Sequence, residues 1–599
     1  MIRRGFLVTR IALTVLLAVG CPARANDSVE QRVKGISDAY ASLGRFSGAI
    51  LVAQHGRVVF ARGYGQANKE LNVPNTRETK FDLGSLSKQF TAAAILKLES
   101  QGKLSVNDLI ARYLPDYPKP QGERITIHHL LTHTSGIPSL GQRGGISEPP
   151  NRSDPVSLEE LIALFKDHPL QFNPGEKYRY NNSGYILLAA IIEKASGQTY
   201  DAYLKRNLFD PAGMSDTGRQ PVSKVATGYL GYAPEFTKAA FVHPSWAIGA
   251  GGIYSTVNDL FKWNIALDAG KVLSPEQTER FFKAHVSRGR PGRNYAYGWF
   301  IDEVHGERAI NHGGTTEGFV SAYYRFPERG LLIVVLSNYM PRLGIDISDQ
   351  IADRVAAEII GDHYEVLPVT TRLSDRELRR FVGEYEFERG YKLTIQLRNH
   401  QLVSSTAGKD WTLPTYSSLV KLDRRAPKVE KAVRIVRAFV AGDHETISEL
   451  AAPGRREEIT KDAVIAVKNE VAEKWGRLMA ITPFAVGKDG AVRHRVTFTK
   501  GEMFMLIEFN DKDEFVGWFY GNRMMPPAVP LIPVLAKQSP DRNRQTSFRF
   551  YADGFRYDEG AAWGEKPVFL EFRLDREKVI DVVIEQNGEY RGRKVVGGG

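Results

Sequence analysis

Apolar residues gather into short, strand-like segments near both ends of the first 340 residues of the chain. Residues 46–62 form two such segments around Gly56, and residues 319–338 form two more around Gly330. Short apolar segments that are separated by a few turn-forming residues are typical of β-hairpins. The pattern therefore predicts one hairpin near the start of this region and another near its end.

Between the hairpins, the apolar positions follow the spacing of α-helices. Helical periodicity begins at Ser85 and returns at residues 158–166 and 185–196. Strands at both ends with helices between them predict an α+β fold, in which the two ends of the region share one sheet. Residues 141–155 are rich in glycine, proline, serine and asparagine, and we expect them to form an exposed loop.

After about residue 362 the pattern changes to shorter strand-like segments, with one helical stretch at residues 429–440. A first domain at 26–365 would then be followed by a small β module at 373–425, an α+β module at 426–523, a proline-rich linker at 524–546 and a C-terminal β module at 547–599. The α+β module resembles the cone-shaped fold of nuclear-transport-factor-like proteins. We find no catalytic group of residues in these units and interpret them as accessory, with cell-wall association as one candidate task.

The first 25 residues have the layout of an export signal. Arg3, Arg4 and Arg10 precede the apolar run at 11–20, and residues 23–25 offer a cleavage site. The run is shorter than the roughly 20 residues that cross a bilayer, and no later run reaches that length. We therefore expect an exported protein, periplasmic or secreted, without a transmembrane segment. Sec and twin-arginine signals are both open, and a lipoprotein signal fits less well.

Composition argues against several classes of function. The only cysteine, Cys21, would leave with the signal, so the mature chain would have no disulfide and no thiolate nucleophile. The formal net charge is +11, but no basic stripe interleaved with aromatic residues points to nucleic acid. His128, His129 and His133 have no partner at metal-ligand spacing, and a structural role suits them better.

A serine and a lysine stand three residues apart in Ser85-Leu-Ser-Lys88. On a helix this spacing places both side chains on one face. A serine hydroxyl becomes a nucleophile when a base removes its proton, and a lysine is such a base near neutral pH only if burial or positive charge lowers its pKa. Neighbouring leucines, alanines and Phe90 would supply an apolar setting. Because the pair is common by chance, other segments must support it.

Two later segments offer further groups for the same site. Residues 173–185 are rich in turn formers and carry Tyr180 and Asn182, a proton carrier and an amide. Residues 311–318, Asn-His-Gly-Gly-Thr-Thr-Glu-Gly, open a strand whose glycines would let a substrate backbone approach its edge.

Together these segments resemble the serine β-lactamase and penicillin-binding-protein superfamily, on the branch with class C β-lactamases, D-Ala-D-Ala carboxypeptidases, D-aminopeptidases and related esterases. Ser85-Leu-Ser-Lys88, Tyr180-Asn-Asn182 and His312-Gly-Gly314 match its three ordered elements, and the likeness covers roughly residues 30–360. The resemblance implies a β-lactamase/transpeptidase-like fold, with an antiparallel sheet flanked by helices and a helical subdomain. It implies no metal and no organic cofactor.

The resemblance also implies catalytic roles. Ser85 would attack a carbonyl and form an acyl-enzyme, while Lys88 and Tyr180 move the proton. The expected activity is that of an exported serine hydrolase on small amides or esters, above all D-amino-acid-containing or cell-wall peptides. A β-lactamase or carboxylesterase of the same fold is the alternative among enzymes. A non-catalytic ligand sensor or wall-binding scaffold is the alternative from another class.

Substrate-binding roles follow in the same way. Asn182 and His312 would hold the substrate, and Gly314 and Thr315 would line the third-strand element, with the N–H groups of Ser85 and Thr315 as the oxyanion hole. Class C β-lactamases have a lysine where this chain has His312. A histidine is mostly neutral at pH 7, so the exchange makes penicillin hydrolysis less favoured than peptide or ester hydrolysis.

Glu317, next to the third element, has two readings. It could meet a substrate amine or simply be solvated at the surface, and the second reading is favoured.

Overall fold

The computed structural model describes residues 28–594 with gaps, which are short up to residue 346 and longer beyond it. The gaps are 43, 142–144, 150, 220–224, 233–234, 291, 341–346, 363–372, 388–391, 399–400, 408–425, 454–455, 457–458, 487–491, 510–513, 522–528, 535–546, 553–567, 576–577 and 586–588. The predicted export signal and most of the predicted linker at 524–546 lie outside the described residues. Among the helices that are described, none is long and apolar enough to cross a membrane.

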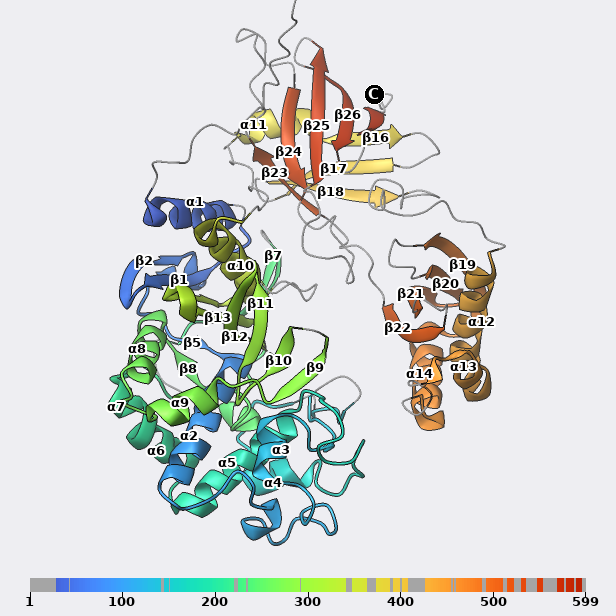
Figure 1. The fold of residues 1–599 in the computed structure, drawn as a ribbon. Helices are drawn as coiled ribbons and strands as arrows, with labels where there is room; N and C mark the ends of the chain where they lie inside the picture. Colours follow the sequence, from blue (N-terminus) through green and yellow to red (C-terminus); the bar gives the residue numbers. More distant parts are fainter. Residues whose placement is uncertain are drawn as a thin grey trace, which may run out of the picture.

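An eight-stranded antiparallel sheet is the middle layer of the first domain (Figure 1), with strand order β2-β1-β14-β13-β12-β11-β10-β9. Its strands are β1 Gly48–Gln54, β2 Arg57–Tyr64, β9 Val286–Arg290, β10 Arg293–Tyr295, β11 Phe300–Val304, β12 Glu307–Thr316, β13 Phe319–Phe326 and β14 Leu331–Ser337. Gly48 of β1 lies opposite Ser337 of β14, so both ends of the region share the sheet. The two predicted hairpins, β1–β2 and β13–β14, are confirmed.

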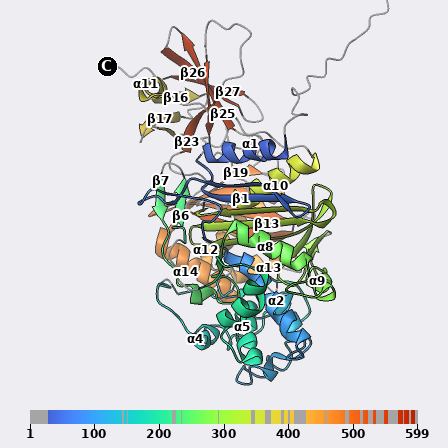
Figure 2. The same ribbon diagram turned by 90° about the vertical axis from the view of Figure 1, so that its left-hand side faces the viewer.

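Helices cover both faces of this sheet (Figure 2). Helices α1 (Val29–Ser42) and α10 (Ile347–Ile360) lie together on one face, over an apolar cluster that includes Tyr40 and Val335. Helix α8 (Val257–Asp268) packs against β1 and β14 on the other face. Because both faces are covered, all seven residues of β14 are buried, which explains its unbroken apolar run.

The helical part of the domain is built around α2 and α5, which contact each other directly. Its helices are α2 Lys88–Ser100, α3 Ile127–Leu131, α4 Leu158–Ala163, α5 Asn182–Ser196, α6 Tyr200–Leu204, α7 Asp210–Ala212 and α9 Pro275–Phe281. The helix predicted from Ser85 begins as a 3₁₀ turn, η1 (Gly84–Ser87), that continues into α2. The helix predicted at 158–166 ends early, at Ala163, and the one predicted at 185–196 begins early, at Asn182.

Short strands complete the domain. They are β3 Gln66–Asn68, β4 Val73–Pro74, β5 Phe81–Asp82, β6 Tyr229–Tyr232, β7 Glu235–Lys238, β8 Tyr254–Ser255 and β15 Tyr339–Met340. Strand β5 pairs with β8 directly before η1, and this pairing anchors the chain that leads into the predicted nucleophile.

Strands from the beginning and the end of the C-terminal part form one closed barrel, in the order β16-β17-β18-β23-β24-β25-β26-β27. Their bounds are β16 Gly383–Phe387, β17 Lys392–Arg398, β18 Gln401–Ala407, β23 Val529–Val534, β24 Ser547–Ala552, β25 Val568–Asp575, β26 Lys578–Glu585 and β27 Glu589–Lys594. This pairing corrects the prediction of two separate β modules, because strands from 373–425 and 547–599 share the barrel. It also places β23 inside the predicted linker. Three strands alone would expose two edges, and closing the barrel removes them.

An α+β unit is inserted into the barrel between β18 and β23 (Figure 1). It contains α12 Pro427–Ala441, α13 His444–Leu450, α14 Lys461–Trp475 and a four-stranded sheet of β19 Leu478–Val486, β20 Val492–Phe498, β21 Gly501–Phe509 and β22 Phe515–Gly521. The helix predicted at 429–440 lies within α12, which ends at Gly442 with φ 77°. The resemblance of this unit to the cone-shaped fold stays a prediction.

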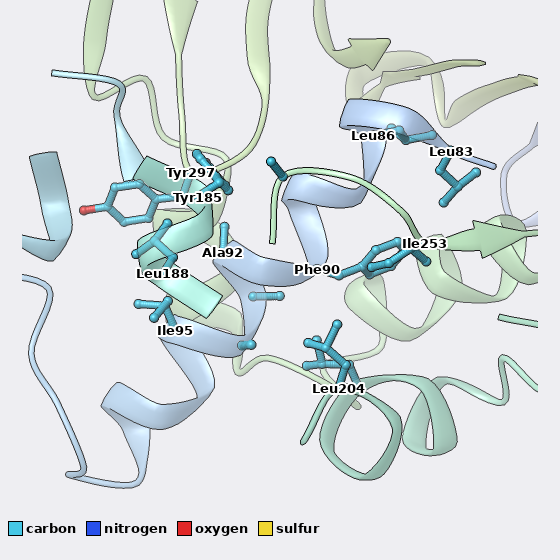
Figure 3. Packing of buried hydrophobic residues seen from close by; sticks show 14 of the residues in the cluster. Leu83, Leu86, Phe90, Ala92, Ile95, Tyr185, Leu188, Leu204, Ile253 and Tyr297 are labelled. Carbon is cyan, nitrogen blue, oxygen red and sulfur yellow. The ribbon is translucent and has the colours of Figure 1, made fainter. Parts of the chain in front are cut away.

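The core of the helical part supports the chain around η1 and α2 (Figure 3). Phe90 of α2 is fully buried, and its ring meets Phe209 at 5.2 Å and Trp263 at 5.0 Å between centroids, both edge-on. Edge-to-face contacts of this kind add to the free energy gained by burial. Phe90 therefore connects α2 to two other elements of the domain.

We expect Phe90→Ala to lower the free energy of unfolding by about 3–5 kcal/mol, because it leaves a cavity in a close-packed core. Leu71→Ala is the control, since Leu71 is 73% exposed and its truncation should change stability by less than about 0.5 kcal/mol. Urea unfolding followed by tryptophan fluorescence measures both. Equal losses in the two variants would contradict this description of the core.

Candidate active site

Ser85 lies in the 3₁₀ turn η1, between strand β5 and helix α2. Gly84 has a φ of 51°, a conformation that favours glycine, and its N–H donates to the Oδ1 of Asp82 at 2.8 Å. The first N–H groups of a helix have no partner within it. The backbone N–H of Ser85 is one of these groups, so it is available to an oxyanion.

Lys88 is fully buried, and its Nζ lies within hydrogen-bond distance of three oxygen atoms. These are the Ser85 Oγ at 3.0 Å, the Asn182 Oδ1 at 2.9 Å and the Ala250 carbonyl oxygen at 2.8 Å. Burial holds the pKa of Lys88 well below its usual range, because the charged amine is disfavoured away from water. The predicted pairing of Ser85 with Lys88 is therefore present, and burial favours the neutral form of the lysine.

The direction of the hydrogen bond between Lys88 and Ser85 depends on the charge of the lysine. A charged amine has three N–H donors, which match the three oxygen atoms around it. A neutral amine has two N–H donors and one lone pair, while a carbonyl oxygen and an amide oxygen can only accept. In the neutral form, which burial favours, the two donors go to Asn182 and Ala250 and the lone pair is left for the Ser85 hydroxyl. That form would be able to take the serine proton.

Tyr180 brings its ring close to the same amine. The ring centroid lies 4.9 Å from the Lys88 Nζ. Burial raises the pKa of Tyr180, and the nearby hydroxyl of Ser85 offsets part of this rise. The buried Tyr180 hydroxyl has no partner of ordinary hydrogen-bond geometry among the described residues. The structure thus places Tyr180 beside Ser85 and Lys88, as predicted, with its hydroxyl unpaired.

Asn182, the first residue of α5, binds the amine of Lys88. Its Oδ1 accepts from the amine, and its Nδ2 donates to the carbonyl oxygen of Leu140 at 3.2 Å. Both ends of the amide are thereby engaged within the protein. Asn182 also lines the cleft next to Ser85, but its contacts show a positioning role toward Lys88. Its predicted role in substrate binding stays a prediction.

The third-strand element touches η1 backbone to backbone. A Cβ at Gly314 would lie 1.9 Å from the Leu83 carbonyl oxygen and 2.9 Å from the Ser85 nitrogen. A Cβ at Gly84 would lie 2.7 Å from the Thr315 nitrogen. Only glycine permits this approach at either position. The backbone nitrogens of Ser85 and Thr315 are thereby brought to one place, which is the arrangement that an oxyanion hole needs.

His312 is 2% exposed and stacks on Phe300 at 4.5 Å between ring centroids. Its Nε2 lies 3.3 Å from the hydroxyl of Tyr295, and its ring centroid 6.1 Å from that of Tyr180. Burial, with a smaller contribution from Lys88, lowers the pKa of His312 to about 3. The expectation of a neutral histidine here agrees with this environment, and the third element presents no cation.

A cleft of about 270 Å³ opens beside Ser85, and its lining includes Gly141, Asn182, Ala250 and Thr315. Lys88, Tyr180 and His312 are not among its lining residues in the part of the chain that the structure describes. Ser85 therefore faces the cleft while Lys88, Tyr180 and His312 lie further inside. This separation keeps the Lys88 amine away from bulk water.

Four charged residues line the described part of the cleft. Three of them, Asp82, Glu148 and Arg152, were not among the site residues predicted from the sequence. The fourth, Glu317, accepts from the Arg152 Nη2 at 3.1 Å, and Arg152 also pairs with Glu148. The favoured reading of Glu317 as simply solvated is thus wrong. Residues 148 and 317 are too far apart in sequence for any local pattern to join them.

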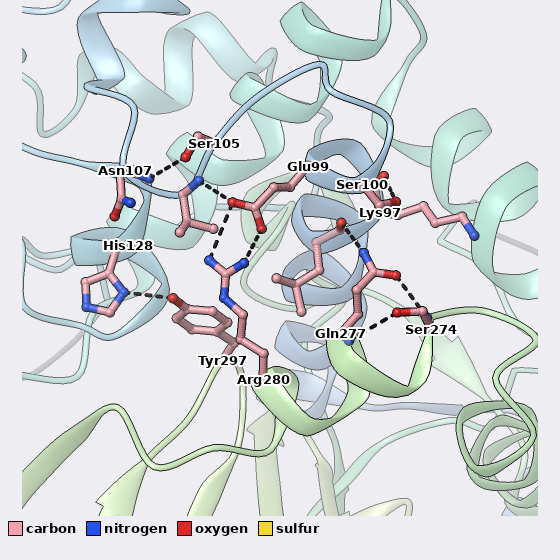
Figure 4. A network of polar contacts seen from close by, with 12 residues as sticks. Lys97, Glu99, Ser100, Ser105, Asn107, His128, Ser274, Gln277, Arg280 and Tyr297 are labelled. Carbon is pink, nitrogen blue, oxygen red and sulfur yellow. Dashed lines mark hydrogen bonds and ion pairs between the residues drawn. The ribbon is translucent and has the colours of Figure 1, made fainter.

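The three histidines noted in the sequence take structural positions. His128 binds the Tyr297 hydroxyl at 2.8 Å through its Nδ1 (Figure 4), and His129 completes the capping box of α3 with Thr126. His133 is buried against Tyr180. Within the described residues, no group of three or more histidine, cysteine or carboxylate side chains could hold a metal ion.

Comparison with known proteins matches residues 27–358, more than half of the chain, to the family described as Beta-lactamase. Penicillin-binding protein 4* of Bacillus subtilis (strain 168) is 28% identical over 412 residues, which cover 63% of this chain and 89% of that protein.

Two solved structures share the fold. The octameric penicillin-binding protein homologue from Pyrococcus abyssi is 22% identical with a TM-score of 0.51, and covers 94% of this chain and 99% of its own. D-amino acid amidase from Ochrobactrum anthropi SV3 is 23% identical with a TM-score of 0.51, over 56% of this chain and 99% of its own. The first likeness extends into the C-terminal units. With its sheet, its buried Ser85–Lys88 pair and this match, the chain belongs to the β-lactamase family.

Proposed function

We propose that the protein is an exported serine hydrolase that forms an acyl-enzyme at Ser85 and hydrolyses small amides or esters. The observation that carries this proposal is the contact between the buried Lys88 amine and the Ser85 hydroxyl, in a site where Asn182 and Ala250 accept the other hydrogen bonds of the amine. A serine with a neutral, water-excluded base has the activation that acyl transfer requires.

The steps follow from this geometry. The Ser85 Oγ attacks the carbonyl carbon of the substrate while its proton passes to the Lys88 Nζ. The N–H groups of Ser85 and Thr315 bind the oxyanion. When the carbon–nitrogen or carbon–oxygen bond breaks, the leaving group takes the proton from Lys88 through the Tyr180 hydroxyl. A water molecule then attacks the acyl carbon of the ester at Ser85 and gives one proton to the same base. The bond between that carbon and the Ser85 Oγ breaks, the base returns the proton to the Oγ, and the acid is released.

The charges of the cleft favour a substrate with a cationic group. Three carboxylates, Asp82, Glu148 and Glu317, line it against one guanidinium, and Arg152 is bound to two of them. His312 is neutral, so among the described residues that line or adjoin the cleft no unpaired cation awaits a substrate carboxylate. A D-amino-acid amide or peptide with a free ammonium suits this cleft better than a penicillin does. This favours aminopeptidase-like over carboxypeptidase-like or β-lactamase activity.

Ser85 is the residue to test first. We expect Ser85→Ala to abolish covalent labelling by a fluorescent fluorophosphonate, because the nucleophile is lost. Ser87→Ala should label like the wild type, since Ser87 is buried within η1 and its Oγ only accepts from the Ile253 N–H at 3.4 Å. Gel fluorescence measures both variants. Labelling of the Ser85→Ala protein would overturn the proposal.

The pH dependence of acylation tests the base. Lys88 must be neutral to accept a proton, so acylation by an uncharged ester should slow as pH falls through the lowered pKa of Lys88. Lys88→Arg should reduce the rate at least about 100-fold, because an arginine stays protonated.

His312→Gln is the matched control for this pH profile. Because the pKa of His312 is about 3, the histidine is already neutral across the working range, and its replacement should leave the acid limb in place. The measurement is the rate of acylation, followed by stopped flow or rapid quench over an assay range from about pH 4 to about pH 9. If His312→Gln no longer showed the fall in acylation rate at low pH, that fall would belong to His312 and not to Lys88.

A substrate pair tests the charge of the cleft. D-alanine p-nitroanilide should be hydrolysed with a lower KM than its N-acetyl derivative, which has no ammonium. Glu317→Gln should raise the KM of the free amine about fivefold and leave the acetylated compound unchanged, the size expected for a partly exposed charge pair. Glu303→Gln, an exposed change on β11, is the control.

Asp82 adds a pH term to the same comparison. Burial raises the pKa of Asp82 to about 6, so its negative charge is present above that pH and is lost below it. The preference for the free amine should therefore weaken below about pH 6. If the preference for the free amine is the same above and below about pH 6, Asp82 does not contribute to it.

A further inference from the structure

His133 joins the segment after α3 to the stretch of chain that carries Tyr180. It is 1% exposed, and it makes two hydrogen bonds to that stretch. Its carbonyl oxygen accepts from the Arg179 N–H at 2.9 Å, and its ring Nδ1 accepts from the Asn181 N–H at 3.0 Å. One residue thus binds the backbone immediately before and immediately after Tyr180.

The His133 ring also contacts the Tyr180 ring itself. Their centroids are 4.4 Å apart with 38° between the ring planes, the shortest of the four tyrosine contacts of this histidine. Tyr295 and Tyr185 surround the same ring at 4.6 Å and 5.1 Å. Close ring contacts in a buried cluster restrict how far Tyr180 can rotate or shift.

The backbone of His133 is held in an uncommon conformation to make these contacts. Its φ is 58°, in the left-handed region that costs energy for residues other than glycine. The other described non-glycine residues with positive φ, His55, Asn72 and His305, lie in turns as His133 does, but none of the three is buried. A strained residue inside the core, beside a reacting group, is more often kept for function than a strained residue of a surface turn is.

The contacts of His133 also define its protonation. Because Nδ1 accepts a hydrogen bond, the neutral ring carries its hydrogen on Nε2. Burial holds the pKa of His133 well below its usual range, so the ring stays neutral. Its Nε2 has no hydrogen-bond partner among the described residues, and its nearest neighbours are tyrosine rings. His133 is therefore suited to hold Tyr180 in place rather than to exchange a proton with substrate.

We propose that His133 is a positioning residue, which holds the Tyr180 hydroxyl beside Ser85 through the two flanking backbone hydrogen bonds and the ring contact. This inference rests on the proposed function, because it assigns to Tyr180 the proton transfer to the leaving group. It predicts that His133 affects the reaction only through the Tyr180 hydroxyl.

A double-mutant cycle measures this dependence. We expect His133→Leu to lower kcat for D-alanine p-nitroanilide, whose leaving nitrogen must be protonated, by about 30-fold to 100-fold, within the range that one proton-transfer group contributes, and to change KM less than about threefold. In the Tyr180→Phe background, which lacks the hydroxyl, the same substitution should change kcat less than about threefold. An equal factor in both backgrounds, or a loss that falls on KM alone, overturns the inference.

A conservative variant separates position from folding. Asparagine tolerates positive φ and offers an acceptor near the place of the ring Nδ1, so His133→Asn should retain more kcat than His133→Leu. Thermal melting followed by circular dichroism reports on folding. If the leucine variant does not fold, His133→Asn replaces it in the cycle with the same criterion. Less kcat in a folded asparagine variant than in the folded leucine variant would also contradict the inference.

His128→Asn is the matched control. It changes the same residue type in the same segment, but His128 binds the Tyr297 hydroxyl (Figure 4), and its ring contacts are with His129, His285 and Tyr297. Its kcat should stay within about twofold of the wild type. Labelling of Ser85 keeps the two proposals apart. A wild type that no acylating probe labels overturns both, whereas a labelled wild type with an additive cycle overturns only the role of His133.

Discussion

The buried amine of Lys88 is the interaction on which the rest of the site depends. It connects three segments that are distant in sequence, namely the turn with Ser85, the start of α5 at Asn182 and the chain at Ala250. An amine without charge can be buried only where its hydrogen-bonding groups are matched. Here two carbonyl-type oxygens match the donors and the serine hydroxyl matches the lone pair. The same contacts that make the burial tolerable also orient the base.

The sheet and the helical part contribute different halves of the chemistry. Helix α2 and its 3₁₀ turn carry Ser85 and Lys88, the proposed nucleophile and base, while strand β12 carries His312 and Thr315, whose N–H is the second proposed oxyanion donor. The two halves meet where Gly84 and Gly314 allow backbone contact. The apolar core under α2 and the aromatic cluster around Tyr180 keep water from the base. A site at this junction depends on the packing of both layers.

Local pattern was sufficient for much of the fold and for the central residues of the site. Apolar segments on either side of short turns identified the hairpins β1–β2 and β13–β14, and ordered motifs identified Ser85, Lys88 and Tyr180. The barrel was missed because its strands are separated in sequence by an inserted unit. The Arg152–Glu317 pair was missed because the partners stand 165 positions apart. The contact of Lys88 with Ala250 could not be predicted from the sequence, because it is made by a backbone carbonyl oxygen that every residue has.

The sequence by itself determined which chemical groups are present and which elements carry them, because helix and strand periods and short motifs are local properties. Only the tertiary structure decided how those groups behave. Burial favours the neutral forms of Lys88 and His312, and the pairing of Arg152 with two of the three carboxylates leaves the described lining of the cleft negative. Each of these properties depends on contacts between distant segments, because the dielectric surroundings of a group and its partners arise only when the chain is folded.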